Sequence, residues 1–285
     1  MFEVLTNETL APNLHRMTVR APRIAAARKA GQFVIIRSEQ GEERIPLTIG
    51  DADSEAGTIT LFIQALGAGT KKIVSRQPGE FLRDVAGPLG MPTDIEKWGR
   101  VACIGGGVGT AVLFPMAKAL ADLGNEVTTI IGGRSKPYII LADELAEFSA
   151  EVQITTDDGS LGQQGFVTTA LQALLDDPER CPEAVFAVGP VPMMRAISEL
   201  TRPYGIKTLV SLNPIMIDGT GMCGGCRVQV GDEVKFACVD GPEFDAHLVD
   251  FTSLMDRLTM YREQEQCCRL DEQLTARAHL KENGQ

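Results

Sequence analysis

Two hydrophobic patterns divide the first three quarters of the chain. In residues 1–97, short apolar runs such as Phe33–Ile36 and the alternating segment Thr58–Ile63 are separated by polar turns rich in Gly, Glu and Asp. Short strands at this spacing favour a small antiparallel β-barrel. From 98 to 211, apolar runs alternate with longer segments of helical periodicity, which predicts a parallel sheet with helices on its faces. The predicted strands are 101–104, 126–131, 152–155, 184–188 and 207–211, and the predicted helices are 111–123, 141–149, 166–175 and 191–201.

The last quarter has a different character. Residues 212–246 are rich in Gly and Cys and show little hydrophobic periodicity, so we treat them as a separate small domain. Residues 247–285 are charged and are expected to form a helical tail. The predicted organisation is therefore a barrel (1–97), an α/β domain (98–211), a small C-terminal domain (212–246) and a tail (247–285).

Composition and charge exclude several classes of protein. The chain has 285 residues, of which 44% are apolar and 23% charged, so it can bury a core and is neither disordered nor fibrous. Its 27 basic and 38 acidic residues give a net charge of −11, which argues against nucleic-acid binding. No apolar run approaches the 18 residues of a membrane span, and no basic segment followed by an apolar stretch marks the N-terminus as a signal peptide. The expected location is the cytoplasm.

The cysteines are unevenly distributed. Cys103 lies in an apolar run and is expected to be a core residue, and Cys181 is expected to have no chemical role. Five of the seven cysteines fall in the last 63 residues, and this enrichment requires a separate explanation. Cys267 and Cys268 are adjacent in the predicted tail helix, so their side chains point to different faces, and we expect them not to be ligands.

The remaining three cysteines have the spacing of a metal centre. Cys223 and Cys226 form a C-x2-C pair, and Cys238 follows. A cysteine five positions before Cys223 would complete the plant-type spacing of a [2Fe–2S] cluster, but Asp218 occupies that position. The glycines between them allow positive φ and let amide N–H groups point at sulfur. The pattern favours a [2Fe–2S] cluster held by three thiolates and one carboxylate, namely Asp218, Cys223, Cys226 and Cys238.

Two alternatives remain open for this array. Zinc accepts thiolate and carboxylate ligands alike, so a zinc site is possible. A redox-active C-x-x-C of the thioredoxin type normally opens a helix, and the glycines around Cys223 and Cys226 disfavour a helix.

The α/β region opens with a glycine loop. Gly105-Gly106-Gly107-Val108-Gly109-Thr110 follows the strand 101–104, and such a loop lets a pyrophosphate reach backbone amides at a helix N-terminus. Pro115 predicts a later helix start or a kink. Two further turns follow strands that should end at the same sheet edge, where α/β folds bind ligands. The residues expected to bind a dinucleotide are Gly105, Gly107, Val108, Gly109, Thr110, Asp157, Asp158, Gly189, Pro190 and Met193.

Together, the barrel, the GGGVGT loop with its later GP-x-x-M turn (Gly189–Met193), and the cysteine loop resemble the ferredoxin reductase superfamily. Within it, the chain is similar to the electron-transfer subunits of dihydroorotate dehydrogenase. More narrowly, it is similar to the small subunits of NADH-dependent reduced ferredoxin:NADP oxidoreductases, which are electron-bifurcating flavoenzymes also described as sulfide dehydrogenase β subunits. Asp218 and the segment 237–245 carry the narrower resemblance, since the dihydroorotate dehydrogenase partner has four cysteines.

The resemblance implies FAD in the barrel. Arg44-Ile45-Pro46-Leu47-Thr48 resembles the flavin motif R-x-Y-S/T, in which the arginine holds the pyrophosphate and the hydroxyl lies by the flavin N5, although here the spacing is one residue longer and no tyrosine is present. Thr48 is accordingly the expected catalytic residue, with Arg44, Pro46 and Leu47 also at the cofactor. Gly67, Gly69 and Thr70 resemble the second phosphate loop.

The resemblance also implies a function. NAD(H) would exchange a hydride with FAD, and the cluster would carry single electrons to a larger FAD and [4Fe–4S] subunit that resembles the glutamate synthase small subunit, with the acidic tail helping to bind it. Arg134 and Lys136 could meet a 2′-phosphate, yet the resemblance favours NAD over NADP. His15, His247 and His279 lie outside every motif and are expected to be surface or core residues. The alternatives are the dihydroorotate dehydrogenase subunit and a non-catalytic, zinc-binding reductase-like module.

Overall fold

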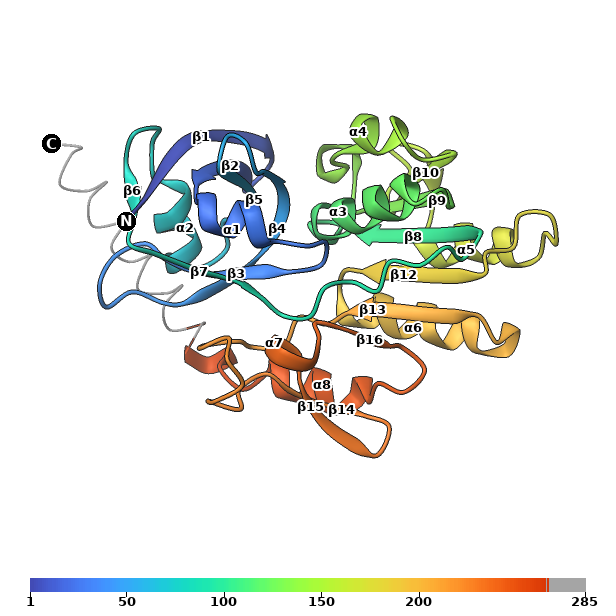
Figure 1. Ribbon diagram of the computed structural model, residues 1–285. Coiled ribbons are helices and arrows are strands. Elements are labelled where there is room, and N and C mark those ends of the chain that lie inside the picture. The colour runs from blue at the N-terminus through green and yellow to red at the C-terminus, as the bar shows by residue number, and fades with distance from the viewer. Residues whose placement is uncertain (265, 267–285) are drawn as a thin grey trace, which may run out of the picture.

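A computed structural model describes residues 1–264 and 266 of the chain. Figure 1 shows the barrel and the α/β unit side by side, with the C-terminal unit below both. The three units contact one another, and the candidate site lies where the barrel meets the C-terminal unit.

The N-terminal region forms one antiparallel sheet with the strand order β6-β1-β2-β5-β4-β3-β7. Its core is apolar and is contributed by alternate positions of the strands, such as Ile59, Leu61 and Ile63. The sheet curls into a nearly closed barrel, as predicted. Its elements are β1 (Phe2–Ala11), β2 (Leu14–Arg20), α1 (Pro22–Ala27), β3 (Phe33–Arg37), β4 (Ile45–Asp53), β5 (Thr58–Gln64), α2 (Ala68–Val74), β6 (Phe81–Leu82) and β7 (Asp84–Leu89).

Strand β3 explains how the barrel is attached to the rest of the molecule. Val34 and Ile36 point into the barrel core, whereas Phe33 and Ile35 belong to the core that continues into the other two units. The uninterrupted apolar run 33–36 is therefore buried on both faces.

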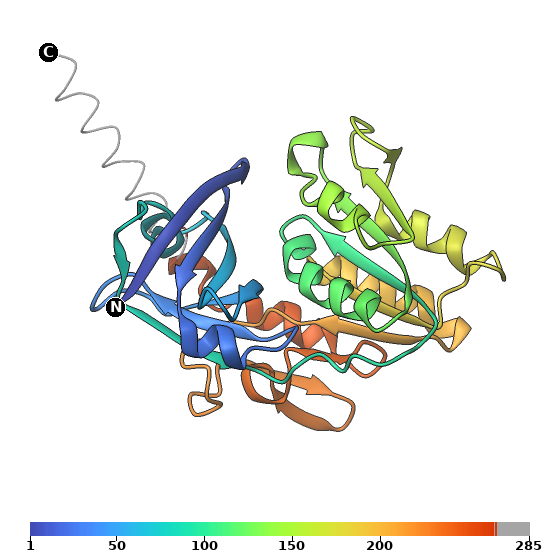
Figure 2. The ribbon, with the colours of Figure 1, turned by 45° about the horizontal axis from the view of Figure 1, so that its top comes forward.

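The second region is a sheet of the order β11-β10-β9-β8-β12-β13-β16, in which only β16 is antiparallel to its neighbour. Helices α3 and α4 cover one face and α5 and α6 the other, because successive strand residues alternate between the two cores (Figure 2). The elements are β8 (Arg100–Gly106), α3 (Gly109–Asp122), β9 (Glu126–Gly133), η1 (Lys136–Tyr138), α4 (Ala142–Ala146), β10 (Glu151–Thr156), β11 (Gln163–Gln164), α5 (Val167–Leu175), β12 (Ala184–Val188), α6 (Val191–Thr201), η2 (Arg202–Tyr204) and β13 (Lys207–Ser211).

The expectation for Pro115 was wrong in one respect. Helix α3 starts at Gly109, within the glycine loop, and Pro115 lies inside the helix. A proline removes one backbone donor, yet it is tolerated here because the helix is firmly packed, with Leu113, Met116 and Leu120 fully buried on either side of it.

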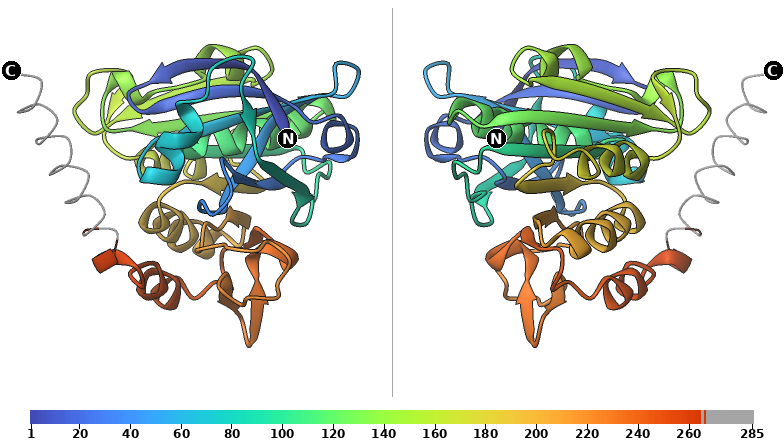
Figure 3. Two further views of the ribbon diagram at one scale, coloured as in Figure 1. Left: turned by 90° about the vertical axis from the view of Figure 1, so that its left-hand side faces the viewer. Right: turned by 90° about the vertical axis from the view of Figure 1, so that its right-hand side faces the viewer.

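The C-terminal unit consists of β14 (Arg227–Val230), β15 (Glu233–Phe236), α7 (Ala237–Asp240), β16 (Glu243–Asp245) and α8 (Phe251–Leu258). Strand β16 pairs with β13 and so extends the α/β sheet, while the β14–β15 hairpin projects away from it (Figure 3). The predicted tail helix begins as α8, and Phe251 and Leu254 bury it in the core that the C-terminal unit shares with α6 of the α/β unit. Among the described residues, no helix is long and apolar enough to cross a membrane.

Candidate functional site

The cysteine array lies in the loop between β13 and β14 and in the short helix α7. Cys226 and Cys238 are buried, with their sulfur atoms 3.2 Å apart, whereas Cys223 is exposed. Backbone amides point at sulfur in two places: the N–H of Gly225 donates to Cys223 Sγ (3.5 Å) and that of Cys238 to Cys226 Sγ (3.4 Å). Such N–H···S contacts are typical of loops that hold metal–thiolate centres.

Asp218 lies beside Cys223. Its carboxylate accepts hydrogen bonds from the Cys223 N–H (2.7 Å), from the Thr220 N–H (2.6 Å) and from the Thr220 hydroxyl. These bonds, led by the Thr220 hydroxyl, hold the pKa of the Asp218 carboxyl well below its usual range, so the group is an anion. Asp218 thus contacts the backbone of Cys223, whereas Cys226 and Cys238 contact each other through their sulfur atoms.

This arrangement is compatible with a two-iron centre. Each iron of a [2Fe–2S] cluster takes two protein ligands, whereas a structural zinc ion needs four ligands around one point. Across the described part of the chain, no three Cys, His, Asp or Glu side chains gather closely enough to share one ion. Burial, together with neighbouring Cys226, raises the pKa of the Cys238 thiol to about 12, so a thiolate there requires the positive charge of bound metal.

Arg44 connects the barrel to this loop. Its Nε donates to the carbonyl of Ile217 (2.9 Å) and its Nη2 to the carbonyl of Asp218 (3.2 Å). Arg44, which is predicted to bind the flavin pyrophosphate, therefore also hydrogen-bonds to the backbone of the candidate cluster ligand Asp218. Its role toward FAD stays a prediction.

The other predicted flavin residues of this segment lie on β4. Pro46, Leu47 and Thr48 are half-buried and pair with Ile35, Val34 and Phe33 of β3, respectively. Thr48 is thus held in a regular ladder at the side of the barrel that faces the other units.

The second predicted phosphate loop, Gly67–Thr70, forms the start of helix α2 and lies beside the segment that contains Arg44. A Cβ on Gly69 would lie 2.5 Å from Glu43 Oε2 and 2.8 Å from Ile45 Cδ1, so the turn packs closely on these two side chains. The Thr70 hydroxyl accepts from the Gly67 N–H (3.1 Å) and closes the turn. The structure therefore brings Gly67, Gly69 and Thr70 together with the segment that starts at Arg44.

The glycine loop after β8 lies at the topological switch point of the sheet. Strand β8 is flanked by β9 and β12, and the chain leaves it to one side first and returns to the other later. Folds of this topology bind ligands outside the carboxyl ends of the strands at this point. Gly107 has φ +55° and donates its N–H to the carbonyl of Gly132 (2.8 Å). A Cβ on Gly109 would lie 2.3 Å from the Val188 carbonyl oxygen, so α3 packs directly against the end of β12.

The Gly189–Met193 turn closes against the same loop. A Cβ on Gly106 would lie 2.5 Å from Met193 Sδ, and one on Gly189 would lie 2.6 Å from Met193 Cε. Pro190 precedes the first turn of α6. At the start of α3, next to Val108, the Thr110 hydroxyl is fully buried and has no hydrogen-bond partner among the described residues. The Thr110 side chain packs against β8, where a Cβ on Gly105 would lie 2.7 Å from the hydroxyl oxygen, and its role toward a nucleotide stays a prediction.

The third predicted turn lies against the end of β9. The N–H of Asp157 donates to Gly133 (3.1 Å) and that of Asp158 to the carbonyl of Arg134 (3.3 Å), and all three side chains that were predicted to bind cofactor, Asp157, Asp158 and Arg134, are exposed. The Asp158 carboxylate accepts from the Ser160 hydroxyl (2.6 Å), which lowers its pKa. Asp158 thus has a structural role in its own turn.

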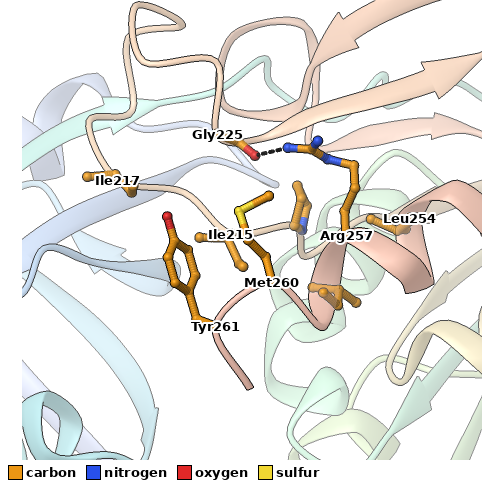
Figure 4. Close-up of a pocket in the computed structure, with 9 residues that line it drawn as sticks. Ile215, Ile217, Gly225, Leu254, Arg257, Met260 and Tyr261 are labelled. Carbon is orange, nitrogen blue, oxygen red and sulfur yellow. Dashed lines mark hydrogen bonds between the residues drawn. The ribbon is translucent and has the colours of Figure 1, made fainter. Parts of the chain in front are cut away.

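One residue of the site had not been singled out from the sequence. Arg257 of α8 donates through Nη2 to the carbonyl of Gly225, between the two cysteines of the C-x2-C pair (2.9 Å; Figure 4). Its helical spacing from Leu254, at i and i+3 on the buried face of α8, is the signal that could have revealed it.

Residues predicted to have no role lie away from the site. Cys103 is fully buried in the sheet, and burial raises the pKa of its thiol to about 12, which confirms it as a core residue. His15 contacts Asn7 and His247 contacts Thr201. The remaining predictions of this kind, for Cys267, Cys268 and His279, lie outside the described residues.

The barrel, the glycine loop at the switch point and the ligand loop define a ferredoxin reductase-like electron-transfer protein. Residues 213–250 match the iron-sulfur cluster binding domain of dihydroorotate dehydrogenase B, which favours iron–sulfur over the zinc alternative. A dihydroorotate dehydrogenase B (NAD(+)) electron transfer subunit homolog from Thermotoga maritima is 44% identical over 263 residues, 92% of each chain. The chain belongs to this family of electron-transfer subunits.

Solved structures agree with this assignment. The structure of an NADH-dependent reduced ferredoxin-NADP oxidoreductase, described for its insights into flavin-based electron bifurcation, superposes with a TM-score of 0.89 at 42% identity, covering 95% of this chain and 97% of the other. A ferredoxin reductase of carbazole 1,9a-dioxygenase shares the fold at a TM-score of 0.60 and 22% identity, covering 72% of this chain and 64% of the other. The chain is an electron-transfer subunit of the NADH-dependent ferredoxin-NADP oxidoreductase and dihydroorotate dehydrogenase B type.

Proposed function

We propose that this chain moves electrons between NAD(H) and a larger flavoprotein subunit by way of bound FAD and a [2Fe–2S] cluster. When bound, FAD exchanges two electrons with a nicotinamide as a hydride and passes them on singly, and the cluster carries one electron at a time. The observation that carries the proposal is the direct contact between the two cofactor segments, in which Arg44 of the barrel donates to the carbonyl of Asp218 in the cluster loop.

The chain's own residues have distinct tasks in this scheme. The α2 turn and the β4 segment would hold FAD, with Thr48 as the hydroxyl beside the reacting ring. The glycine loop and the Gly189–Met193 turn would hold NAD(H), with backbone N–H groups at the start of α3 directed at its phosphates. Asp218, Cys223, Cys226 and Cys238 would hold the cluster.

The cofactor content can be measured directly. Protein purified without oxygen should contain about one FAD, two irons and two acid-labile sulfides per chain, and NADH should reduce an artificial dye through it. Asp218→Cys should keep the cluster and change its reduction potential if the carboxylate binds iron. An unchanged potential would count against ligation by Asp218, and stoichiometric zinc without sulfide would overturn the proposal as a whole.

The nicotinamide preference is proposed as NAD. No acidic residue follows β9 directly in the sequence to bind a ribose 2′-hydroxyl, and Arg134 and Lys136 are exposed there, while Asp157 and Asp158 of the neighbouring turn lie against the end of β9. The preference for NAD comes from the similarity to the NADH-dependent oxidoreductase. A higher kcat/KM for NADPH than for NADH would overturn it.

The partner is proposed to dock over the cluster loop. Exposed apolar side chains surround the loop, led by Met222 at 89% exposure, with Val239 and Ile217 beside it. Such a patch suits a protein partner, and we propose the larger FAD and [4Fe–4S] subunit of a bifurcating cytoplasmic oxidoreductase. Co-purification with the native partner, followed by an assay of NAD-dependent ferredoxin reduction, tests both the partner and bifurcation.

The second candidate partner is a dihydroorotate dehydrogenase. The name of the Thermotoga maritima relative favours it, while Asp218 in place of a cysteine favours the first candidate. Dihydroorotate-dependent reduction of the co-purified complex would select this alternative.

A further inference from the structure

The cationic side chain of Arg257 lies among apolar side chains and hydrogen-bonds to the backbone of the cluster loop. It projects from α8 across a small cavity, whose other lining residues include Ile215, Leu254 and Leu258, and its Nη2 reaches the carbonyl of Gly225 (2.9 Å; Figure 4). Gly225 immediately precedes the ligand candidate Cys226. The guanidinium is thus fixed close to the sulfur-bearing turn by packing as well as by a hydrogen bond.

The charge of Arg257 has no counter-ion in the part of the chain that the structure describes. None of the ion pairs formed by the described residues includes Arg257, and its Nε is buried without a hydrogen-bond partner. Arg257 is partly buried, a guanidinium stays cationic, and even partial burial without a compensating anion is unfavourable. This is unusual in a chain with a net charge of −11, in which carboxylates are abundant.

The compensating anion is supplied by the ligand set itself. Three thiolates and the Asp218 carboxylate, joined to iron and sulfide, form a centre with net negative charge that becomes more negative on reduction. A fixed cation nearby in an apolar setting therefore stabilises the reduced state more than the oxidised state.

We propose that Arg257 is a positioning residue that holds the Cys223–Cys226 turn in place and raises the reduction potential of the iron–sulfur centre. The inference rests on the proposed function, since it needs the cluster to be present. Arg44 contacts the same loop, but it is exposed to solvent, which screens its charge, so we expect its electrostatic effect to be smaller.

The test is a redox titration of the holoprotein in complex with its partner, followed by electron paramagnetic resonance. Arg257→Gln should disfavour the reduced cluster by about tenfold, equivalent to a fall of about 59 mV for a one-electron couple. Arg257→Lys retains the charge and should keep the potential within about threefold of the unmodified protein. Arg262→Gln removes an exposed arginine four residues after the end of α8 and is the matched control, expected to change nothing.

Each outcome of this titration either supports or overturns the inference. Equal potentials in Arg257→Gln and the Arg262→Gln control would overturn the inference. If Arg257→Gln fails to assemble a cluster, Arg257→Lys decides: assembly with a near-normal potential supports the inference, and failure to assemble in a folded protein overturns it. Absence of iron and sulfide from the unmodified protein would instead refute the proposed function.

Discussion

Glu243 offers a prediction whose size can be worked out from the structure. Its carboxyl lies where β16, the barrel turn at Gly31 and the connecting segment at Thr93 meet, and the Thr93 hydroxyl donates to Oε1 (2.8 Å). Burial raises the pKa of Glu243 to about 7 from an ordinary value of 4.5, with the Thr93 hydrogen bond partly offsetting it. The folded protein therefore binds a proton here that the unfolded chain releases at lower pH.

The sign and size of the effect on stability follow from this difference. A carboxyl whose pKa is raised on folding stabilises the folded state fully below pH 4.5, and this contribution is lost as the pH rises through about 7. Each pKa unit is worth about 1.36 kcal/mol, so the loss reaches about 3 kcal/mol, an upper value because the residue keeps some exposure. Glu243→Gln, which stays neutral, should not lose stability in this way.

Thermal unfolding of the holoprotein between pH 5 and pH 8 measures the effect. At about 2–4 °C per kcal/mol for a chain of this size, the melting temperature of Glu243→Gln should rise relative to that of the unmodified protein by roughly 5–10 °C over this range. Glu96→Gln, which removes an exposed carboxylate from the same connecting segment, is the control. A difference between Glu243→Gln and the unmodified protein that does not change with pH would refute the assignment of the buried proton to Glu243.

Three further predictions concern the α/β unit. Gly109→Ala places a Cβ against the Val188 carbonyl oxygen and should destabilise the protein by about 1–3 kcal/mol. It should also weaken NADH binding, measured by calorimetry. Unchanged stability and affinity would contradict the close packing of α3. Thr110→Val removes a hydroxyl that has no partner among the described residues, so it should change the free energy of unfolding by less than about 1 kcal/mol. If Thr110 belongs to the nucleotide site, the Kd for NADH should rise. An unaltered Kd would exclude Thr110 from that site. Leu113→Ala empties a fully buried position and should cost about 2–5 kcal/mol of stability by denaturant titration, with a loss below about 1 kcal/mol contradicting the packing described here.

The fold could largely be read from the sequence because its signals are local. Strands and helices of the α/β region follow from hydrophobic periodicity, and the predicted helices 166–175 and 191–201 agree with α5 and α6 within one residue. The start of α3 was predicted too late because Pro115 was given more weight than packing. The hairpin of β14 and β15 gave no periodic signal, since its strands are four residues long and partly exposed.

The candidate site was predictable only in part. Spacing alone predicted Asp218, Cys223, Cys226 and Cys238 as ligands, and the structure brings Cys226 and Cys238 together from the loop and α7, while ligation of iron stays a prediction. The contacts of Arg44 and Arg257 with that loop join residues far apart in sequence, and no local pattern encodes such meetings. The burial of Glu243 likewise depends on three segments that converge only in the folded chain.

The pairing of β16 with β13 has a consequence for the modularity of the protein. Residues beyond the ligand array return to complete the α/β sheet, so Leu209–Ser211 is covered by Glu243–Asp245. The iron–sulfur unit therefore cannot be cut out or grafted elsewhere as a self-contained cassette without exposing a sheet edge. Any evolutionary or engineered exchange of the redox centre has to carry the neighbouring strand with it.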